Sequence, residues 1–175
     1  MIVDTSGSTG MTVRTPSAGG GGATPPFASG QGVRFLDTSK QLLHAILDVL
    51  PAHLDALRAK QLINPKPVHL RLWHFDATTT KLADIYLGDA SGSGFAQTTC
   101  AQLQAALTGL RPGGCTNYDS WSCELRSAVA AAPSALHSVL LVTDGGATSR
   151  AQFFASIDAI RTQPGIGFFQ VQLHC

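Results

Sequence analysis

The chain has 175 residues, a length that suits one domain with a substantial buried core. Only 13% of its residues are charged and its formal net charge is +1, so no strong field would attract nucleic acid or anionic lipid. No apolar run approaches the ~20 residues of a membrane span, and the N-terminus lacks a hydrophobic signal core, so we expect a cytoplasmic protein.

The four cysteines show neither a Cys-x-x-Cys pair nor the compact Cys/His cluster that a zinc site needs. We therefore interpret Cys100, Cys115, Cys123 and Cys175 as buried or idle thiols. The short distance in sequence from Met1 to the first predicted strand, and the end of the chain on another strand, also fit a piece of a longer protein.

Two β-branched residues end at Asp4 and predict the end of a buried strand that opens into a loop. The loop presents one carboxylate and two hydroxyls at alternate positions, Asp4, Ser6 and Ser8, and Gly7 lets the backbone bring them together. Convergent oxygens without Cys or His suit Mg²⁺ or Mn²⁺. A helix N-cap or a polar turn has the same composition, so this loop alone does not decide between the two interpretations.

Residues 9–35 consist largely of Gly, Pro, Ser, Thr and Ala. Such a stretch buries little apolar surface and has high conformational entropy, so it predicts a flexible insertion within a single domain that spans residues 1–175. The insertion lies beside the proposed metal loop, where it could contact a partner or form a lid. The alternative, which we favour, is a tolerated surface insertion.

An amphipathic helix is predicted after the insertion. Residues 37–39 supply polar side chains for its N-cap, and Pro51 is expected to kink the helix or to start a second one. Its apolar face is expected to cover the sheet and consists of Leu42, Leu43, Ile46, Leu47 and Leu50.

The middle of the chain predicts a hairpin. Val68 to Phe75 alternates like a strand, and Lys81 to Leu87 is expected to return beside it as an antiparallel edge. His74 and Asp76 come at the loop end of the first strand and could support the metal site, although an ordinary turn is the simpler interpretation. A second Asp-x-Ser-x-Ser string at residues 89–93 follows the edge strand, and we interpret it as a helix-capping loop.

The second half of the chain alternates helices and strands. After a helical pattern, Gly113-Gly-Cys-Thr116 forms a glycine turn that presents a hydroxyl at the start of another helix. Residues 138–143 are nearly all apolar, as expected of a parallel strand covered on both faces, and they end at Asp144. A further helix and a strand at residues 166–173 complete the sequence.

This order predicts an α/β fold, an open and mostly parallel sheet flanked by helices on both faces with one antiparallel edge hairpin. Ligands of such sheets bind at the carboxyl ends of the strands. Asp4 and Asp144 each follow a strand directly, so we expect both carboxylates at the same edge of the sheet. Thr116 can join them there from its own loop.

Together, Asp4-x-Ser6-x-Ser8, the glycine turn before Thr116 and the apolar strand that ends at Asp144-Gly resemble the von Willebrand factor type A domain with its metal-ion-dependent adhesion site. The resemblance covers nearly the whole chain. It implies a Rossmann-like fold, and members of the family usually have a further helix and strand beyond the segment that matches residues 166–173. Cys115, between the glycines and Thr116, departs from the family's Gly-Gly-Thr pattern.

The resemblance also implies a function. An ion such as Mg²⁺ or Mn²⁺ would be held by Asp4, Ser6, Ser8, Thr116 and Asp144, and a protein partner would complete its coordination with an Asp or Glu carboxylate. Neither nucleic acid nor a membrane is expected as a partner. We therefore expect a metal-dependent binding module and not an enzyme.

Alternative functions remain open at this point. Asp144-Gly-Gly-Ala-Thr148 is loosely similar to a phosphate-binding loop, so a nucleotide-binding or hydrolytic enzyme could use the Asp4 and Asp144 loops. Asp4-Thr-Ser-Gly is similar to the Asp-Thr-Gly of aspartic proteases, but Ser6 interrupts it and those proteases are all-β. A degenerate, purely structural domain of the same fold is the third alternative.

Overall fold

Five strands form the main sheet of the protein. The computed structural model describes residues 1–7, 12–13, 33–63, 67–88, 94–96, 99–144 and 150–172. The strand order is β5-β4-β1-β6-β7, and only the pair β4 and β5 is antiparallel. The strands are β1 (Ile2–Asp4), β4 (Val68–Phe75), β5 (Thr79–Leu87), β6 (His137–Thr143) and β7 (Ile166–Gln172).

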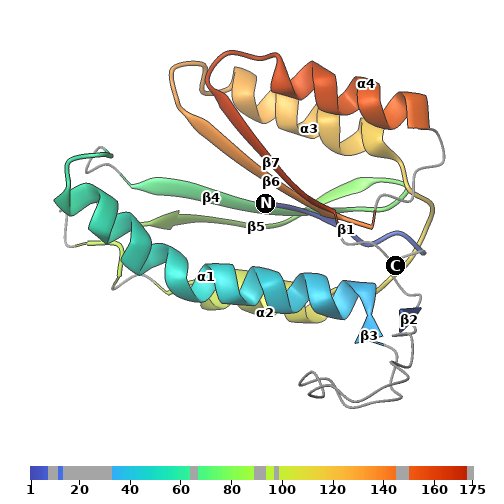
Figure 1. Ribbon diagram of the computed structural model, residues 1–175, viewed down its shortest axis with the longest axis horizontal. Helices are drawn as coiled ribbons and strands as arrows, with labels where there is room; N and C mark the ends of the chain where they lie inside the picture. The colour runs from blue at the N-terminus through green and yellow to red at the C-terminus, as the bar shows by residue number, and fades with distance from the viewer. Residues whose placement is uncertain are drawn as a thin grey trace, which may run out of the picture.

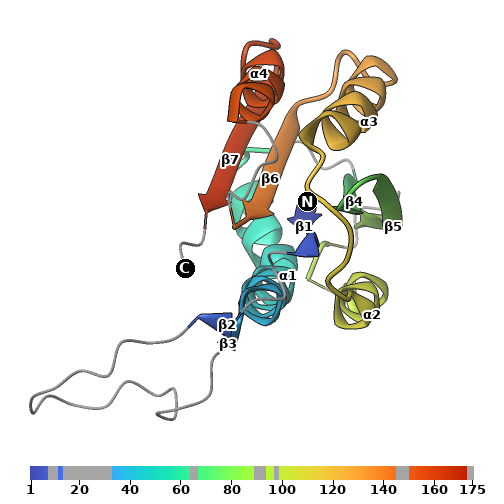
Figure 2. The same cartoon turned by 90° about the vertical axis from the view of Figure 1, so that its right-hand side faces the viewer.

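Helices cover both faces of the sheet (Figure 1). Figure 2 shows the three layers from the side, with one pair of helices on each side of the strands. One face is covered by α1 (Phe35–Ala59) and α2 (Ala101–Gly109), the other by α3 (Tyr118–Ala130) and α4 (Arg150–Arg161). The predicted fold class is therefore confirmed.

Each face of the sheet has its own hydrophobic core, because successive side chains of a strand point to opposite sides. In β1, Val3 belongs to the core under α1 and α2, and Ile2 belongs to the core under α3 and α4. The first core also contains Leu36, Leu43, Leu47, Leu72, Leu87, Phe95, Leu103, Leu107 and Val142. The second contains Trp73, Phe75, Tyr118, Trp121, Leu125, Leu141, Ile157 and Ile160. Central strands buried on both faces explain why the sequence of β6 is almost continuously apolar.

The first helix starts earlier than predicted. It begins at Phe35, and Ser39 donates a hydrogen bond from Oγ to the Phe35 carbonyl (3.1 Å) and does not cap the helix. The helix starts early because Phe35 and Leu36 are buried, so packing decides the boundary. Of the two outcomes expected at Pro51, the start of a second helix is excluded, because α1 continues across this buried residue, and the kink stays a prediction.

A short two-stranded ribbon, which was not predicted, bounds the predicted insertion. β2 (Thr12–Val13) pairs antiparallel with β3 (Val33–Arg34), next to the start of α1. The residues between the two strands lie outside the described part of the chain, as does the second Asp-x-Ser-x-Ser string at residues 89–93. None of the described helices combines the length and the hydrophobicity that a membrane span needs.

Candidate functional site

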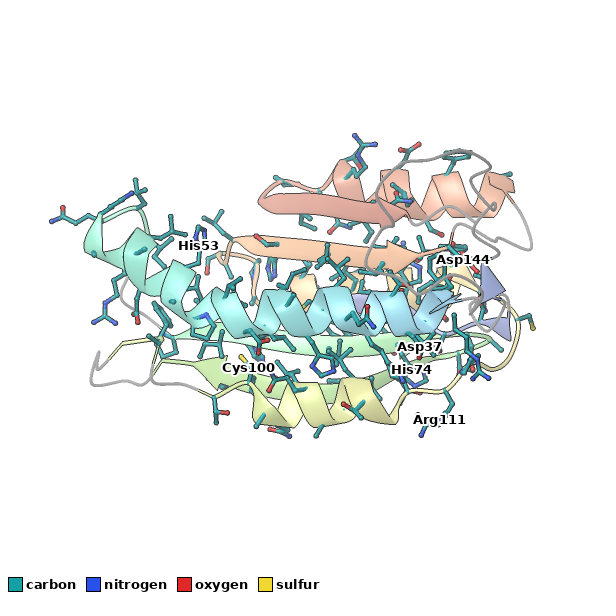
Figure 3. The ribbon with its side chains drawn as sticks, turned by 60° about the horizontal axis from the view of Figure 1, so that its bottom comes forward. Asp37, His53, His74, Cys100, Arg111 and Asp144 are labelled. Carbon is teal, nitrogen blue, oxygen red and sulfur yellow. The ribbon has the colours of Figure 1, made fainter. Side chains whose placement is uncertain are left out.

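The parallel pairing of β1 with β6 brings two aspartates to one edge of the sheet. Ile2 is in register with Leu141 and Val3 with Val142, so Asp4 ends one strand where Asp144 follows the other. Figure 3 shows Asp144 at the end of the sheet where His74, near the end of β4, also lies. Asp4 is buried, with 1% of its surface exposed, and Asp144 is half-buried.

Hydrogen bonds from Ser6 and Thr143 orient the Asp4 carboxylate. Its Oδ1 accepts from the backbone N–H of Ser6 (2.9 Å), and its Oδ2 accepts from the hydroxyl of Thr143 (2.7 Å). The same Thr143 hydroxyl lies 2.8 Å from the buried hydroxyl of Tyr118. A carboxylate has about four lone-pair sites, so Asp4 keeps acceptor capacity for a cation or for water.

The charge of Asp4 is poorly balanced in this position. Burial raises the pKa of Asp4 to about 6, hydrogen bonds from Ser6 and Thr143 oppose that rise, and the charge of Asp144 adds to it. Burial also raises the pKa of Tyr118 well above its ordinary value, so this hydroxyl is neutral and supplies no compensating charge. A cation between the two carboxylates would remove the repulsion and favour the ionised form of Asp4.

The loop that carries Thr116 lies against the loop that follows β1. The N–H of Gly113 donates to the carbonyl of Thr5 (2.8 Å), and the N–H of Gly7 donates to the carbonyl of Gly114 (2.9 Å). Gly114 has a φ of +62°, and a Cβ there would lie 2.9 Å from Cγ of Asp76, so this close approach requires glycine.

Thr116 itself lies two residues further along and is half-buried. The next residue is also anchored, because the N–H of Asn117 donates to the carbonyl of Asp76 (2.9 Å). Cys115 is an exposed free thiol, so the residue that departs from the family pattern points its bulk away from the core. The structure therefore brings the Thr116 loop to the same edge as Asp4 and Asp144.

Thr5 links three segments of the site and was not predicted as a functional residue. Its hydroxyl lies 2.9 Å from Nδ1 of His74 and donates to the carbonyl of Phe75 (3.1 Å), while its own carbonyl accepts from Gly113. His74 thus contacts the loop after β1, and its role in supporting a metal site stays a prediction. Burial lowers the pKa of His74, which the charge of Asp76 partly opposes.

Two further residues beside the site, Asp76 and Thr143, differ in whether the sequence indicated their roles. Asp76 forms a turn with Thr78, whose N–H donates to Oδ1 of Asp76 (3.1 Å), in agreement with the simpler interpretation of this segment. Thr143 was missed, although a polar residue at the end of an apolar strand and directly before Asp144 was a usable signal.

The ligand roles themselves stay a prediction. Asp4, Ser6 and Asp144 lie at one edge with the Thr116 loop, and Ser8 lies outside the described residues. Within the described part of the chain, no three His, Cys, Asp or Glu side chains come together as a metal site of those ligands would need. The proposed set has a different chemistry, with two carboxylates and the remaining donors hydroxyls.

Comparison with known proteins supports the fold. No protein-family model and no curated protein matches the chain. Among solved structures, it is similar to the von Willebrand factor type A protein from Catenulispora acidiphila, with a TM-score of 0.50 and 15% sequence identity over 97% of this chain and 31% of that one. It is also similar to an uncharacterised membrane-spanning protein from Vibrio fischeri, with a TM-score of 0.44 and 14% identity over 98% of this chain and 68% of that one. The chain thus spans about a third of the length of the first of these structures and has the von Willebrand factor type A fold.

Proposed function

We propose that this protein is a divalent-metal-dependent protein-binding module. In this proposal Asp4, Ser6, Ser8, Thr116 and Asp144 hold Mg²⁺ or Mn²⁺ at the carboxyl edge of the sheet. The observation that carries it is the buried carboxylate of Asp4, whose pKa is raised by burial and by the neighbouring charge of Asp144. Two carboxylates in that position suit a cation that balances both.

The chemistry of the donors suits a hard ion with a free coordination position. Mg²⁺ prefers about six oxygen ligands and usually keeps some water. Two carboxylates and three hydroxyls, acting directly or through water, balance its charge without excess. The bound ion would supply a positive centre that attracts a partner's Asp or Glu carboxylate, an attraction that is stronger where water is partly excluded.

The surroundings of Asp4 favour binding over catalysis. Among the described residues, Ser6 and Thr143 donate hydrogen bonds to its carboxylate, and Thr143 in turn touches the neutral Tyr118. The histidine at this edge, His74, has Nδ1 in contact with Thr5. These groups orient a ligand for a metal, and they do not form the nucleophile and base pair that a hydrolytic site needs.

A pull-down in Mg²⁺ and in EDTA tests the proposal. Proteins retained by the immobilised chain in Mg²⁺ should be released by EDTA, restored by Mg²⁺ or Mn²⁺, and absent from an Asp144→Ala chain. Asp158→Ala, which removes an exposed carboxylate on α4, is the matched control and should retain them. Replacing the critical acidic residue of an identified partner by its amide should abolish binding.

Two outcomes would overturn the proposal. A partner that stays bound in EDTA with unchanged affinity would make the ion structural or absent, and a purely structural domain would then be the better account. Mg²⁺-dependent hydrolysis of a nucleotide that is lost in Asp144→Ala would instead favour the enzyme alternative.

A further inference from the structure

One face of the β4 and β5 hairpin changes its character half-way along. Near the candidate site this face is apolar and covered by α3, where the ring of Phe75 lies 5.3 Å from that of Tyr118 and 6.3 Å from that of Trp121. The hydroxyls of Thr79 and Ser120 are 2.7 Å apart at the same contact. In Figure 1 α3 and α4 lie above this part of the hairpin, and the end where β4 begins and β5 finishes extends beyond them.

The uncovered half of the same face is polar. His69 is in register with Tyr86, and Arg71 with Asp84, so these four side chains form two neighbouring cross-strand pairs. On the other face the hairpin stays apolar, with Leu72 and Leu87 buried in the core beneath α1 and α2. Within the described residues, helices α1 and α2 therefore cover one face of the hairpin at this end, and the opposite face is polar.

The charges on this polar half do not cancel. The Asp84 carboxylate is contacted by Lys81 Nζ at 3.0 Å, by Arg71 Nε at 3.6 Å and by Nε2 of His69. Two permanent cations thus share one anion. The contacts described for Arg71 use Nε, so its terminal nitrogens keep the paired donors with which arginine binds a carboxylate bidentately.

A flat aromatic surface lies beside these charges. The rings of His69 and Tyr86 are stacked, with centroids 4.3 Å apart and an interplanar angle of 13°. Tyr86 nevertheless keeps 63% of its surface exposed. Because the stack already orders both rings, a partner that covers Tyr86 loses little further side-chain entropy. Tyrosine and arginine are also the residue types that dominate protein-binding hot spots.

We propose that His69, Arg71, Lys81, Asp84 and Tyr86 form a second protein-binding surface, the hairpin patch, which takes an acidic protein segment with a flat apolar side chain. Charge complementarity selects this occupant: a carboxylate pairs with Arg71 and Lys81, while an aromatic or similar side chain covers Tyr86. Nucleic acid fits less well, since Asp84 in the centre of the patch repels phosphates and two cations make no continuous basic track.

The hairpin patch works independently of the proposed metal site. Arg71, at the centre of the patch, precedes Phe75 by four positions along β4, a separation of ~13 Å at the rise of a β-strand, and Lys81, opposite Trp73, is the patch residue nearest to the site. Binding at the patch should therefore survive EDTA and Asp144→Ala. Evidence against the metal site would therefore not count against the hairpin patch, and evidence against the patch would not count against the metal site.

Selection from a random peptide library tests the patch. A phage library of about twelve-residue peptides is panned in EDTA against the full chain, after removal of phage that bind an Arg71→Gln/Tyr86→Ser chain. Enriched peptides should combine Asp or Glu with an aromatic residue. A synthetic copy should bind the full chain, and Arg71→Gln or Tyr86→Ser should each weaken it about tenfold.

Matched controls separate the patch from general charge and folding effects. Lys60→Gln, which removes an exposed charge at the end of α1, should leave the affinity unchanged. Converting the peptide's acidic residues to amides should cause the same loss against the unmodified chain, which keeps the test valid if a variant fails to fold. No enrichment, enriched peptides without acidic residues, or affinity indifferent to both variants would overturn the proposal. Displacement by oligo(dT), or peptide-free self-association lost in Tyr86→Ser, would assign the patch to nucleic acid or to a second copy.

Discussion

The same string of residue types follows two strands of this protein whose carboxyl ends lie at opposite ends of the sheet. Asp4-x-Ser6-x-Ser8 follows β1, which runs parallel to its neighbours, whereas the string at residues 89–93 follows β5, which is antiparallel to β4. The carboxyl end of β5 therefore lies at the edge of the sheet away from Asp4 and Asp144. Strand direction, and not the string, decides which loop can join a site with other strand ends.

The two strand ends also differ in how the charge of a nearby aspartate is stabilised. Asp4 is buried near Asp144, and its pKa is raised to about 6. By contrast, the carboxylate of Asp55 in α1 accepts from the N–H groups of Phe95 (2.6 Å) and Ala96 (2.5 Å), which follow residues 89–93 in the sequence. These two hydrogen bonds lower the pKa of Asp55. Among the described residues no cation contacts Asp4, whereas the carboxylate of Asp55 is held by backbone N–H groups.

The largest effect is expected from Phe95→Ala, which tests whether the second region is structural. Phe95 is fully buried in the core under α1 and α2, and its ring lies 2.9 Å from the position of a Cβ on Gly88. Removing the ring should lower the free energy of unfolding by about 3–5 kcal/mol. Chemical denaturation measures this loss, and titration with Mn²⁺ should show unchanged metal affinity. Weaker metal binding at unchanged stability would show that the segment around Phe95 serves the metal site and not the core.

The next largest effect is expected from Asp144→Ala at the first region. Even changes to groups outside the ligand shell weaken metal sites by about 10–100-fold, so removal of one of two carboxylates should cost at least about a hundredfold in Mg²⁺ affinity. Ser6→Ala removes a neutral ligand and should cost less. Asp144→Ala should not unfold the metal-free protein, because it relieves repulsion with Asp4. Calorimetric titration with Mg²⁺ measures the affinities, and equal affinity in Asp144→Ala and Asp158→Ala would contradict the site.

Asp4→Asn should stabilise the metal-free protein at neutral pH. The pKa of Asp4 is higher in the folded state, about 6, than its ordinary value of 3.8, so the folded protein holds more protons between these values. The free energy of unfolding should therefore fall as pH rises from about 4 to above 6, by up to about 3 kcal/mol. Asparagine removes this penalty, so the gain should be present at pH 7 and vanish near pH 4. Denaturation in EDTA across this range measures it, and a pH-independent difference would contradict the assignment.

Local patterns predicted most of the fold, and packing decided what they missed. The observed bounds of β4 match the prediction, because alternating side chains and the turn at Asp76 are both local signals. The start of α1 was misplaced, since burial of Phe35 and Leu36 outweighed the capping residues after them. The ribbon of β2 and β3 was missed, because two-residue strands leave no periodic pattern and their pairing joins positions far apart in sequence.

The candidate site also has features that the sequence predicts and features that only the structure shows. The common edge of Asp4 and Asp144 follows from parallel strands that each end at an aspartate, which a sequence can reveal. The contacts of Thr5 with His74 and of Thr143 with Asp4 depend on the register between strands and on side-chain rotamers. No spacing rule encodes that geometry, so these supporting residues emerge only from the structure.

The smallest effect is expected from Asp55→Asn, and the pH dependence of its stability should oppose that expected for Asp4→Asn. Asparagine keeps the shape of the side chain but can accept through one oxygen only, so one of the N–H groups of Phe95 and Ala96 loses its partner.

The sign of the effect follows from the lowered pKa. Between the folded pKa of Asp55 and its ordinary value of 3.8 the unfolded chain binds more protons, so this group's contribution to stability rises with pH. The contribution is complete above the ordinary value and disappears as pH falls through the folded pKa. Asp55→Asn should therefore be modestly less stable than the unmodified chain at pH 7 and equal to it in strong acid. Asp158→Asn, at an exposed position of α4, should show no such difference. Denaturation in EDTA from pH 7 downwards compares all three chains, and a difference that persists in acid, or is missing at pH 7, would show that the carboxylate of Asp55 does not hold the loop.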